Sequence, residues 1–267
     1  MTPVGPWSDW GPLLLALAGV AGLLVGSFLN VLVHRLPRGE SLVSPGSHCP
    51  SCGEPIRPLQ NVPVISWLAL RGKCATCRAP IAIRYPALEL SNGILWVLVA
   101  MRGRDWGEIL SGVFLVSACL ALLAIDAEFQ ILPDKITLTG IAFGIGVAFL
   151  SPSRSPLAAV LGAAAGAGSL FLVAFLYERI AGHEGMGLGD VKMLGMIGAF
   201  IGPWGVLVTI LLASLSGSLV GVLLIVTGAG DRKLRLPFGV FLAVGAVAAF
   251  FFGEPLVARY RALWPAS

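Results

Sequence analysis

Charged residues are scarce in this chain. Aspartate, glutamate, lysine and arginine make up 12% of its 267 residues, whereas 57% of the residues are apolar. A soluble domain typically carries about 25% charged residues, so the composition excludes a soluble globular protein. It is typical of a protein that lies in a lipid bilayer.

Long polar segments are also few, and the apolar runs between them predict membrane-spanning helices. The first run, 11–33, has no basic segment before it and no small-residue cleavage site after it, so we interpret it as a retained helix and not a signal peptide. Residues 1–34 should then form the first transmembrane helix, with a periplasmic N-terminus. Further apolar runs complete a predicted all-α polytopic membrane protein of about eight transmembrane helices: 86–101, 107–125, 136–150, 157–177, 191–201, 204–227 and 238–253.

The positions of lysine and arginine indicate the orientation, because these residues are enriched on the cytoplasmic side of a membrane. If all eight runs cross, the inner side holds 13 of them and the outer side 5. The run 191–201 is short, and if it does not cross, the count becomes 12 to 6. The count therefore favours eight crossings, and the net charge of +4 reflects membrane orientation and not nucleic-acid binding.

Three pairs of glycines predict close contacts between helices. They have the spacing G-x-x-x-G at 140–144, 162–166 and 217–221. Small residues at this spacing let helix backbones approach each other in lipid, although glycine is common in membrane helices for other reasons as well.

Four of the five cysteines lie in the polar segment 35–85, as Cys49-Pro-Ser-Cys52 and Cys74-Ala-Thr-Cys77 with 21 residues between the pairs. This spacing is close to that of a zinc ribbon, in which four thiolates enclose one structural zinc ion. If the four cysteines bound no metal, so small a segment would lack a cross-link to stabilise its fold. His48 is an alternative ligand. We predict a small cytoplasmic zinc-ribbon-like domain, inserted between helices 1 and 2 and followed by a transmembrane catalytic domain at 86–267.

Two aspartates stand at the ends of apolar runs, where a carboxylate is costly and is a functional candidate by default. Asp126 ends the run 107–125, and Asp190 opens the run 191–201 within the stretch GMGLGDVK. The predicted topology puts both on the cytoplasmic side, where a pair of carboxylates can activate a water molecule and protonate a leaving group. The alternatives are a helix N-cap for Asp190 and a helix end that reaches the interface for Asp126.

The helix field suggests different roles for these two residues. Asp190 stands at a predicted helix N-terminus, where the positive end of the helix dipole favours the ionised carboxylate. Asp126 stands near a helix C-terminus, where the negative end favours the protonated acid. We therefore expect Asp190 to be the base that activates water and Asp126 to be the initial acid.

Residues around this pair are candidates for substrate binding. Glu184 and Asp134 contribute to an acidic surface that would attract a cationic partner, and Gly187 and Gly189 leave room for a substrate backbone. Lys192 could tune Asp190 or only mark the inner face.

Several motifs together resemble those of the type IV prepilin leader peptidases. The resemblance runs from about Gly26 to Lys192 and rests on GSFLNVLVHRLP, CPSCGEPI, NVPVISWLALRGKCATC, RYPALE, DAEFQILPD and EGMGLGDVK. The family usually has tyrosine where this chain has His34.

The resemblance implies a bifunctional enzyme of the bacterial inner membrane that serves type IV pili or type II secretion. Such an enzyme cuts the basic leader from prepilins and pseudopilins after a glycine, and then N-methylates the new terminus with S-adenosylmethionine. It implies that Asp126 and Asp190 are the protease aspartates and that the four paired cysteines bind zinc. It also associates the cytoplasmic segment with methyl transfer, which makes Gly72 and Glu89 candidates for cofactor binding.

Two other classes of function compete with this interpretation. A proton-coupled transporter would also use buried aspartates and helices broken by glycine. A membrane scaffold could use the zinc ribbon to recruit a partner. The transporter gains no support from an inverted repeat, and neither class gives the aspartates and the cysteines a role together.

Overall fold

The computed structural model describes residues 11–182, 187–228 and 236–262, and within them every long element is a helix. The helices are α1 (Gly11–Arg35), α2 (Ile65–Ala69), α3 (Arg84–Arg102), α4 (Trp106–Phe129), α5 (Asp134–Ala148), α6 (Pro156–Ala181), α7 (Leu188–Val226) and α8 (Phe238–Ala262). The described residues form no β-strand beyond two isolated bridges. The predicted all-α class is therefore confirmed.

Every predicted apolar run lies in one of these helices to within two residues at its end, with two runs sharing α7. Among the described residues, five helices are long and apolar enough to cross a membrane: α1, α4, α6, α7 and α8. Helix α5 has 15 residues, or about 22 Å at ~1.5 Å per residue, which is shorter than a hydrocarbon core of about 30 Å. A count of eight crossings stays a prediction.

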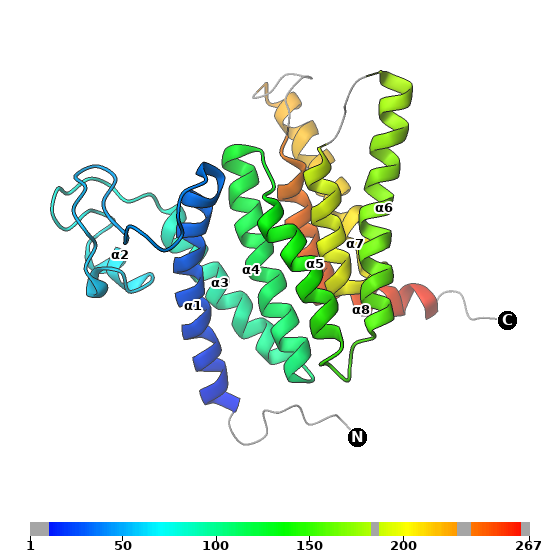
Figure 1. The fold of residues 1–267 in the computed structure, drawn as a ribbon, viewed down its shortest axis with the longest axis horizontal. Coiled ribbons are helices and arrows are strands. Elements are labelled where there is room, and N and C mark those ends of the chain that lie inside the picture. The colour runs from blue at the N-terminus through cyan, green and yellow to red at the C-terminus, as the bar shows by residue number, and fades with distance from the viewer. Residues whose placement is uncertain (1–10, 183–186, 229–235, 263–267) are drawn as a thin grey trace. The chain divides into compact units, whose positions relative to one another are not determined.

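The chain divides into two compact units, residues 1–105 and residues 106–267. Helix α3 therefore belongs with α1 and the cysteine-rich segment, whereas the sequence had grouped it with the domain that begins at residue 86. Figure 1 draws both units.

In unit 1, α1 and α3 pack closely because glycines line their contact. A Cβ atom at Gly26 would lie 2.7 Å from Cα of Glu89, closer than real Cβ atoms come to backbone. The Nδ2 group of Asn92 donates to the carbonyl oxygen of Gly22 at 2.7 Å, so a buried polar group on α3 is satisfied by α1.

In unit 2, helices α4 to α8 form one bundle, in which α6 packs most extensively on α7. Figure 1 shows that α4 and α6 end, and α5, α7 and α8 begin, at the same end of this bundle. The connection between α5 and α6 lies at the opposite end. Asp126, Asp134 and Asp190 occupy the last or first turns at that shared end, because of their positions in α4, α5 and α7.

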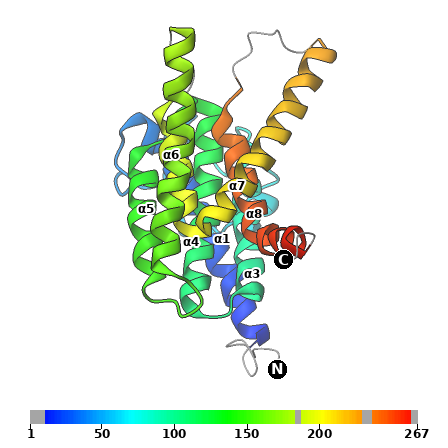
Figure 2. The same ribbon diagram turned by 90° about the vertical axis from the view of Figure 1, so that its right-hand side faces the viewer.

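Helix α7 is broken at Gly202, which has φ 69° and ψ 179° and precedes Pro203. Proline disfavours a helical conformation at the residue before it, and glycine alone adopts this backbone angle easily. The first half of α7 therefore ends here, and in Figure 2 the second half diverges from α6. This break lies between the two predicted runs 191–201 and 204–227.

The carbonyl groups at the end of the first half of α7 are satisfied by Arg154, from the connection between α5 and α6. Its Nη2 group donates to the carbonyl oxygens of Ala199 at 2.9 Å and Phe200 at 2.8 Å, and its Nη1 group donates to the hydroxyl of Ser111. A helix end inside an apolar bundle requires such donors.

We expect the contact between α6 and α7 to tolerate no side chain at Gly162. A Cβ atom there would lie 2.1 Å from the carbonyl oxygen of Gly198, so Gly162→Ala should push the helices apart and destabilise the protein by about 1–3 kcal/mol. Gly168→Ala is the matched control on the same helix, because its Cβ atom would meet nothing within 4 Å. Melting temperatures in detergent test this, and equal values for the two variants would contradict it.

Candidate active site and metal site

The four paired cysteines converge in unit 1. Their Sγ atoms all lie within 4.8 Å of one another, and those of Cys49 and Cys77 are 3.8 Å apart. Four thiolates at ~2.3 Å from one tetrahedral ion would be separated from each other by about 3.8 Å. The cluster can therefore hold a metal ion.

Backbone hydrogen bonds lower the pKa of two of these thiols and so favour the thiolate form. The N–H groups of Cys52 and Ser51 lower the pKa of the Cys49 thiol to about 6. The N–H groups of Cys77 and Thr76 likewise lower the pKa of Cys74. The thiolate is the form of cysteine that binds metal, so these hydrogen bonds favour metal binding by the first cysteine of each knuckle.

The second thiol of the first knuckle behaves differently. A hydrogen bond from the N–H of Glu54 lowers the pKa of Cys52, but removal from solvent and the three neighbouring thiols raise it, and it reaches about 11. Four negative charges this close repel one another, and a bound cation would relieve that repulsion.

The two knuckles repeat each other in sequence and in hydrogen bonding. The N–H of Cys49 donates to Glu54 and that of Cys74 to Ala79, each to the residue five positions on. The repeat can be seen in the sequence as C-x-x-C-x-x-P-I, at 49–56 and 74–81. The two C-x-x-C pairs alone did not predict this longer repeat, which extends to the Pro-Ile that follows each pair.

The two residues predicted to bind a cofactor have local structural roles. Gly72 has φ 66° and lies against the ring of Trp67, where a Cβ atom would come within 2.9 Å of Cζ2. The Oε2 atom of Glu89 accepts a hydrogen bond of 2.7 Å from the N–H of Val64. These contacts explain both residue types without a ligand, and a role in cofactor binding stays a prediction.

Asp126 lies in the last turn of α4 and is only 5% exposed. Helix α4 ends soon after it, where the N–H of Gln130, a residue with φ 53°, donates to the carbonyl oxygen of Asp126. The side-chain Oδ2 atom accepts a hydrogen bond of 3.1 Å from the N–H of Val240, in the first turn of α8. A residue 114 positions away in the chain thus supplies the donor that the buried carboxylate needs.

Asp190 lies in the first turn of α7 and is half-buried. Leu132 lies against Gly189, the residue before Asp190, and against Gly239, which adjoins the carboxylate of Asp126. Unit 2 therefore brings the two predicted catalytic residues together at the shared end of its helices.

The structure removes the argument that assigned different roles to these two residues. That argument counted only the C-terminus of α4 at Asp126. The N-terminus of α8 approaches the same carboxylate with an N–H donor and with the positive end of its own dipole. Asp126 thus lies between the C-terminus of α4 and the N-terminus of α8, whose dipoles have opposite effects on its carboxylate.

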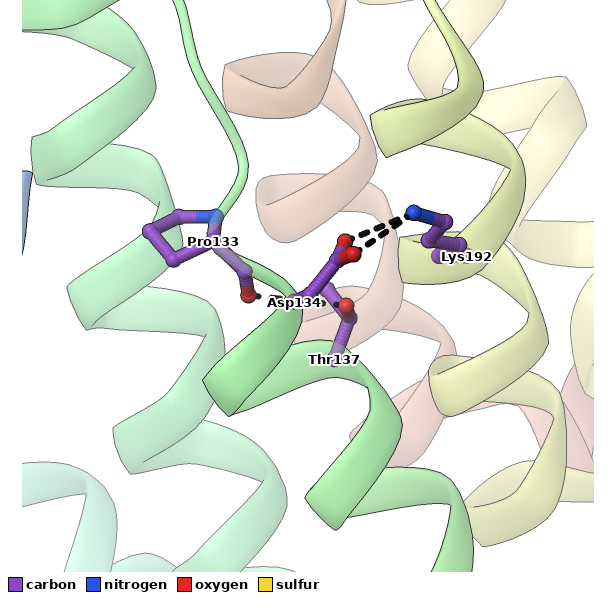
Figure 3. A network of polar contacts seen from close by, with 4 residues as sticks. All are labelled: Pro133, Asp134, Thr137 and Lys192. Carbon is purple, nitrogen blue, oxygen red and sulfur yellow. Dashed lines mark hydrogen bonds and ion pairs between the residues drawn. The ribbon is translucent and has the colours of Figure 1, made fainter.

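Lys192 forms an ion pair with Asp134, across the first turns of α5 and α7. Its Nζ atom lies 2.8 Å from both carboxylate oxygens, as Figure 3 shows. Residues two apart on a helix point to nearly opposite sides, so Lys192 faces away from Asp190 along α7. The ion pair of Lys192 therefore connects α7 to α5 and compensates the charge of Asp134.

The remaining candidates for substrate binding surround the first turn of α7. Gly187 precedes the helix as its N-cap, and Gly189 packs against Leu132, where a Cβ atom would lie 3.0 Å from Cβ of that leucine. Glu184 lies outside the described residues, so its predicted role stays a prediction.

Comparison with known proteins assigns this arrangement to a family. Residues 20–103 match the bacterial peptidase A24 N-terminal domain, and residues 113–222 match the type IV leader peptidase family. The chain belongs to the type IV leader peptidase family. The first match ends within three residues of the boundary between the two units, which supports the placement of α3 in unit 1.

Curated relatives resemble the chain over most of its length. Proteins named prepilin leader peptidase/N-methyltransferase from Burkholderia pseudomallei (strain 1026b) and Neisseria gonorrhoeae are both 40% identical to it, over 90% of this chain and 86% and 91% of their own. The protein of that name from Pseudomonas aeruginosa is 38% identical over 93% of this chain and 94% of its own. No solved structure matches the chain.

We expect the ion pair between Asp134 and Lys192 to depend on opposite charge. Asp134→Lys and Lys192→Asp should each lower the melting temperature, because each places like charges together, and the double variant should recover most of the loss. The two side chains are 53% and 34% exposed, so the coupling should be about 0.2–1 kcal/mol and should weaken with salt.

Lys135→Asp is the control for this charge reversal, because Lys135 is the next residue on α5 and is exposed. It should change the melting temperature little. If the loss of stability in the double variant equals the sum of the losses in the two single variants, the pair is not coupled.

Proposed function

We propose that this protein cleaves the leader peptide of type IV prepilins and of type II secretion pseudopilins, with Asp126 and Asp190 as the catalytic pair. The observation that carries the proposal is the meeting of two buried or half-buried carboxylates at one end of a helical bundle, in a member of the leader peptidase family. Relatives that resemble the whole chain are named for the same activity.

The chemistry follows from two carboxyl groups that share one proton. The ionised aspartate takes a proton from a water molecule, and the water oxygen attacks the carbonyl carbon of the scissile peptide. The protonated aspartate gives its proton to the carbonyl oxygen, and the tetrahedral intermediate then collapses as the amine leaves with a proton. Because Oδ2 of Asp126 accepts from Val240, its Oδ1 atom is the oxygen that serves this exchange.

The substrate would reach these groups at the cytoplasmic face of the bacterial inner membrane. Gly187, where a Cβ atom would meet nothing closer than 3.9 Å, leaves room for an extended backbone near Asp190, whereas Leu132 fills the space beside Gly189. The acidic residues Glu184 and Asp134 would attract a lysine-rich leader. Lys192 already compensates Asp134, so we expect the greater attraction from Glu184.

The second activity in this proposal is methyl transfer from S-adenosylmethionine to the new N-terminus. It is supported by the names of the relatives. The donor would supply an electrophilic methyl group, and unit 1, with Gly72 and Glu89, is the proposed place for it. In the same unit, we propose that the four cysteines hold a structural zinc ion, for which four thiolates leave no open position. A proton-coupled transporter is not favoured, because the family match accounts for the aspartates.

Replacement of either catalytic aspartate should abolish cleavage. Asp126→Asn and Asp190→Asn keep the side-chain volume but cannot exchange a proton, so we expect the cleavage rate to fall by on the order of 10³-fold or more. Cleavage of a prepilin-like peptide by purified protein in detergent measures this. Glu178→Gln, at an exposed acid on α6, should cleave normally, and methylation of a pre-cleaved peptide should continue in all three variants. Cleavage that survives both aspartate replacements would overturn the proposal.

Loss of one cysteine should release the metal. Purified Cys49→Ser should contain much less zinc than the unmodified protein, because three thiolates bind the ion less tightly than four. Cys119→Ala is the control, because Cys119 is buried in α4, outside the cluster. Elemental analysis that finds one zinc ion per chain in all three proteins would refute the assignment of this site.

A further inference from the structure

The first turn of α8 lies directly against the side chain of Asp126. The helix begins at Phe238, so Gly239 and Val240 belong to its first turn, whose N–H groups have no partner within the helix. The N–H of Val240 donates to Oδ2 of Asp126 at 3.1 Å. The carboxylate thus caps a helix to which it does not belong.

Gly239 makes this approach possible. A Cβ atom at this position would lie 2.7 Å from Oδ2 and 3.1 Å from Cγ of Asp126. Contacts under 3.0 Å are essentially never made by real Cβ atoms, so any side chain here would have to move the carboxylate or the helix.

The surroundings leave the carboxylate little freedom to move. Asp126 is 5% exposed, and the same Cβ atom at Gly239 would lie 3.1 Å from Cδ1 of Leu132. Leu132 also lies against Gly189, the residue before Asp190, where a Cβ atom would lie 3.0 Å from its Cβ and 3.4 Å from its Cδ1. Leu132 therefore packs against a glycine near each aspartate. A displacement at Gly239 would change the distance between the carboxylates of Asp126 and Asp190.

We propose that Gly239 is a positioning residue for peptide cleavage: its lack of a side chain lets the first turn of α8 hold Asp126 in one orientation. This inference rests on the proposed role of Asp126 as a catalytic residue. Gly239 acts through Asp126, whose carboxylate its backbone adjoins, and takes no part in the proton exchange itself. Precise placement matters because a shift of about 1 Å in a catalytic group can cost on the order of 10²-fold in rate.

The test compares alanine at two glycines of α8. Gly239→Ala should lower kcat for cleavage about 10- to 100-fold and leave KM within about two-fold, because the catalytic group moves and the substrate contacts stay. Gly253→Ala should cleave normally, since its Cβ atom would meet nothing closer than Cβ of Ala249 at 4.0 Å. Alanine has the higher helix propensity at both positions, so a loss at Gly239 alone cannot come from propensity.

Two further measurements separate positioning from stability. Methylation of a pre-cleaved peptide should be unchanged in Gly239→Ala, and its melting temperature should fall less than that of Gly162→Ala, because the atom to be displaced at Gly239 is the end of a side chain and not backbone. A joint fall of cleavage, methylation and melting temperature would assign Gly239 to stability and overturn the inference. An unchanged kcat, or a rise in KM alone, would also overturn it.

The failure of this inference can be told apart from the failure of the proposed function. If Asp126→Asn abolishes cleavage and Gly239→Ala does not lower kcat, only the positioning role is wrong. If Asp126→Asn still cleaves, the catalytic assignment is wrong as well.

Discussion

Close contact between backbones at glycine is the constraint on which this structure depends. Lipid tails are as apolar as leucine side chains, so helices in a membrane gain little from burying apolar surface and instead associate through close packing. Gly162 and Gly198 bring α6 against α7, and Gly26 brings α1 against Glu89 of α3. The same device, used at Gly239, brings a helix N-terminus against a catalytic candidate.

Scarcity of charge gives the polar contacts of this chain their importance. A buried carboxylate or a helix end in an apolar bundle must find donors within the protein. Arg154 supplies them at the break in α7, and Val240 supplies one to Asp126. The break and the carboxylate are both stable because a distant part of the chain provides the partner.

The sequence predicted the parts of the fold that depend on local properties. Apolar runs predicted the helices, and Gly202 with Pro203 explains why two runs share one interrupted helix. The cysteine spacing predicted a cluster, since each knuckle is a local turn. The spacing G-x-x-x-G predicted contact less well: Gly162 and Gly166 meet the backbone of α7, but Cβ atoms at Gly217 and Gly221 would make only ordinary contacts of 3.4 Å or more with side chains.

Contacts between distant residues could not be predicted, and one of them changes the argument about mechanism. The sequence showed Asp126 at the end of its own helix and did not show the N-terminus of α8 beside it, 114 residues away. Because the C-terminus of α4 and the N-terminus of α8 both act on Asp126, the helix dipoles no longer give a clear difference between its role and that of Asp190. The difference that remains is exposure, because Asp126 is buried and Asp190 is half-buried. Because exposure lowers the cost of a charged carboxylate, this difference favours Asp190 as the ionised member of the pair, and its role as the base that activates water stays a prediction.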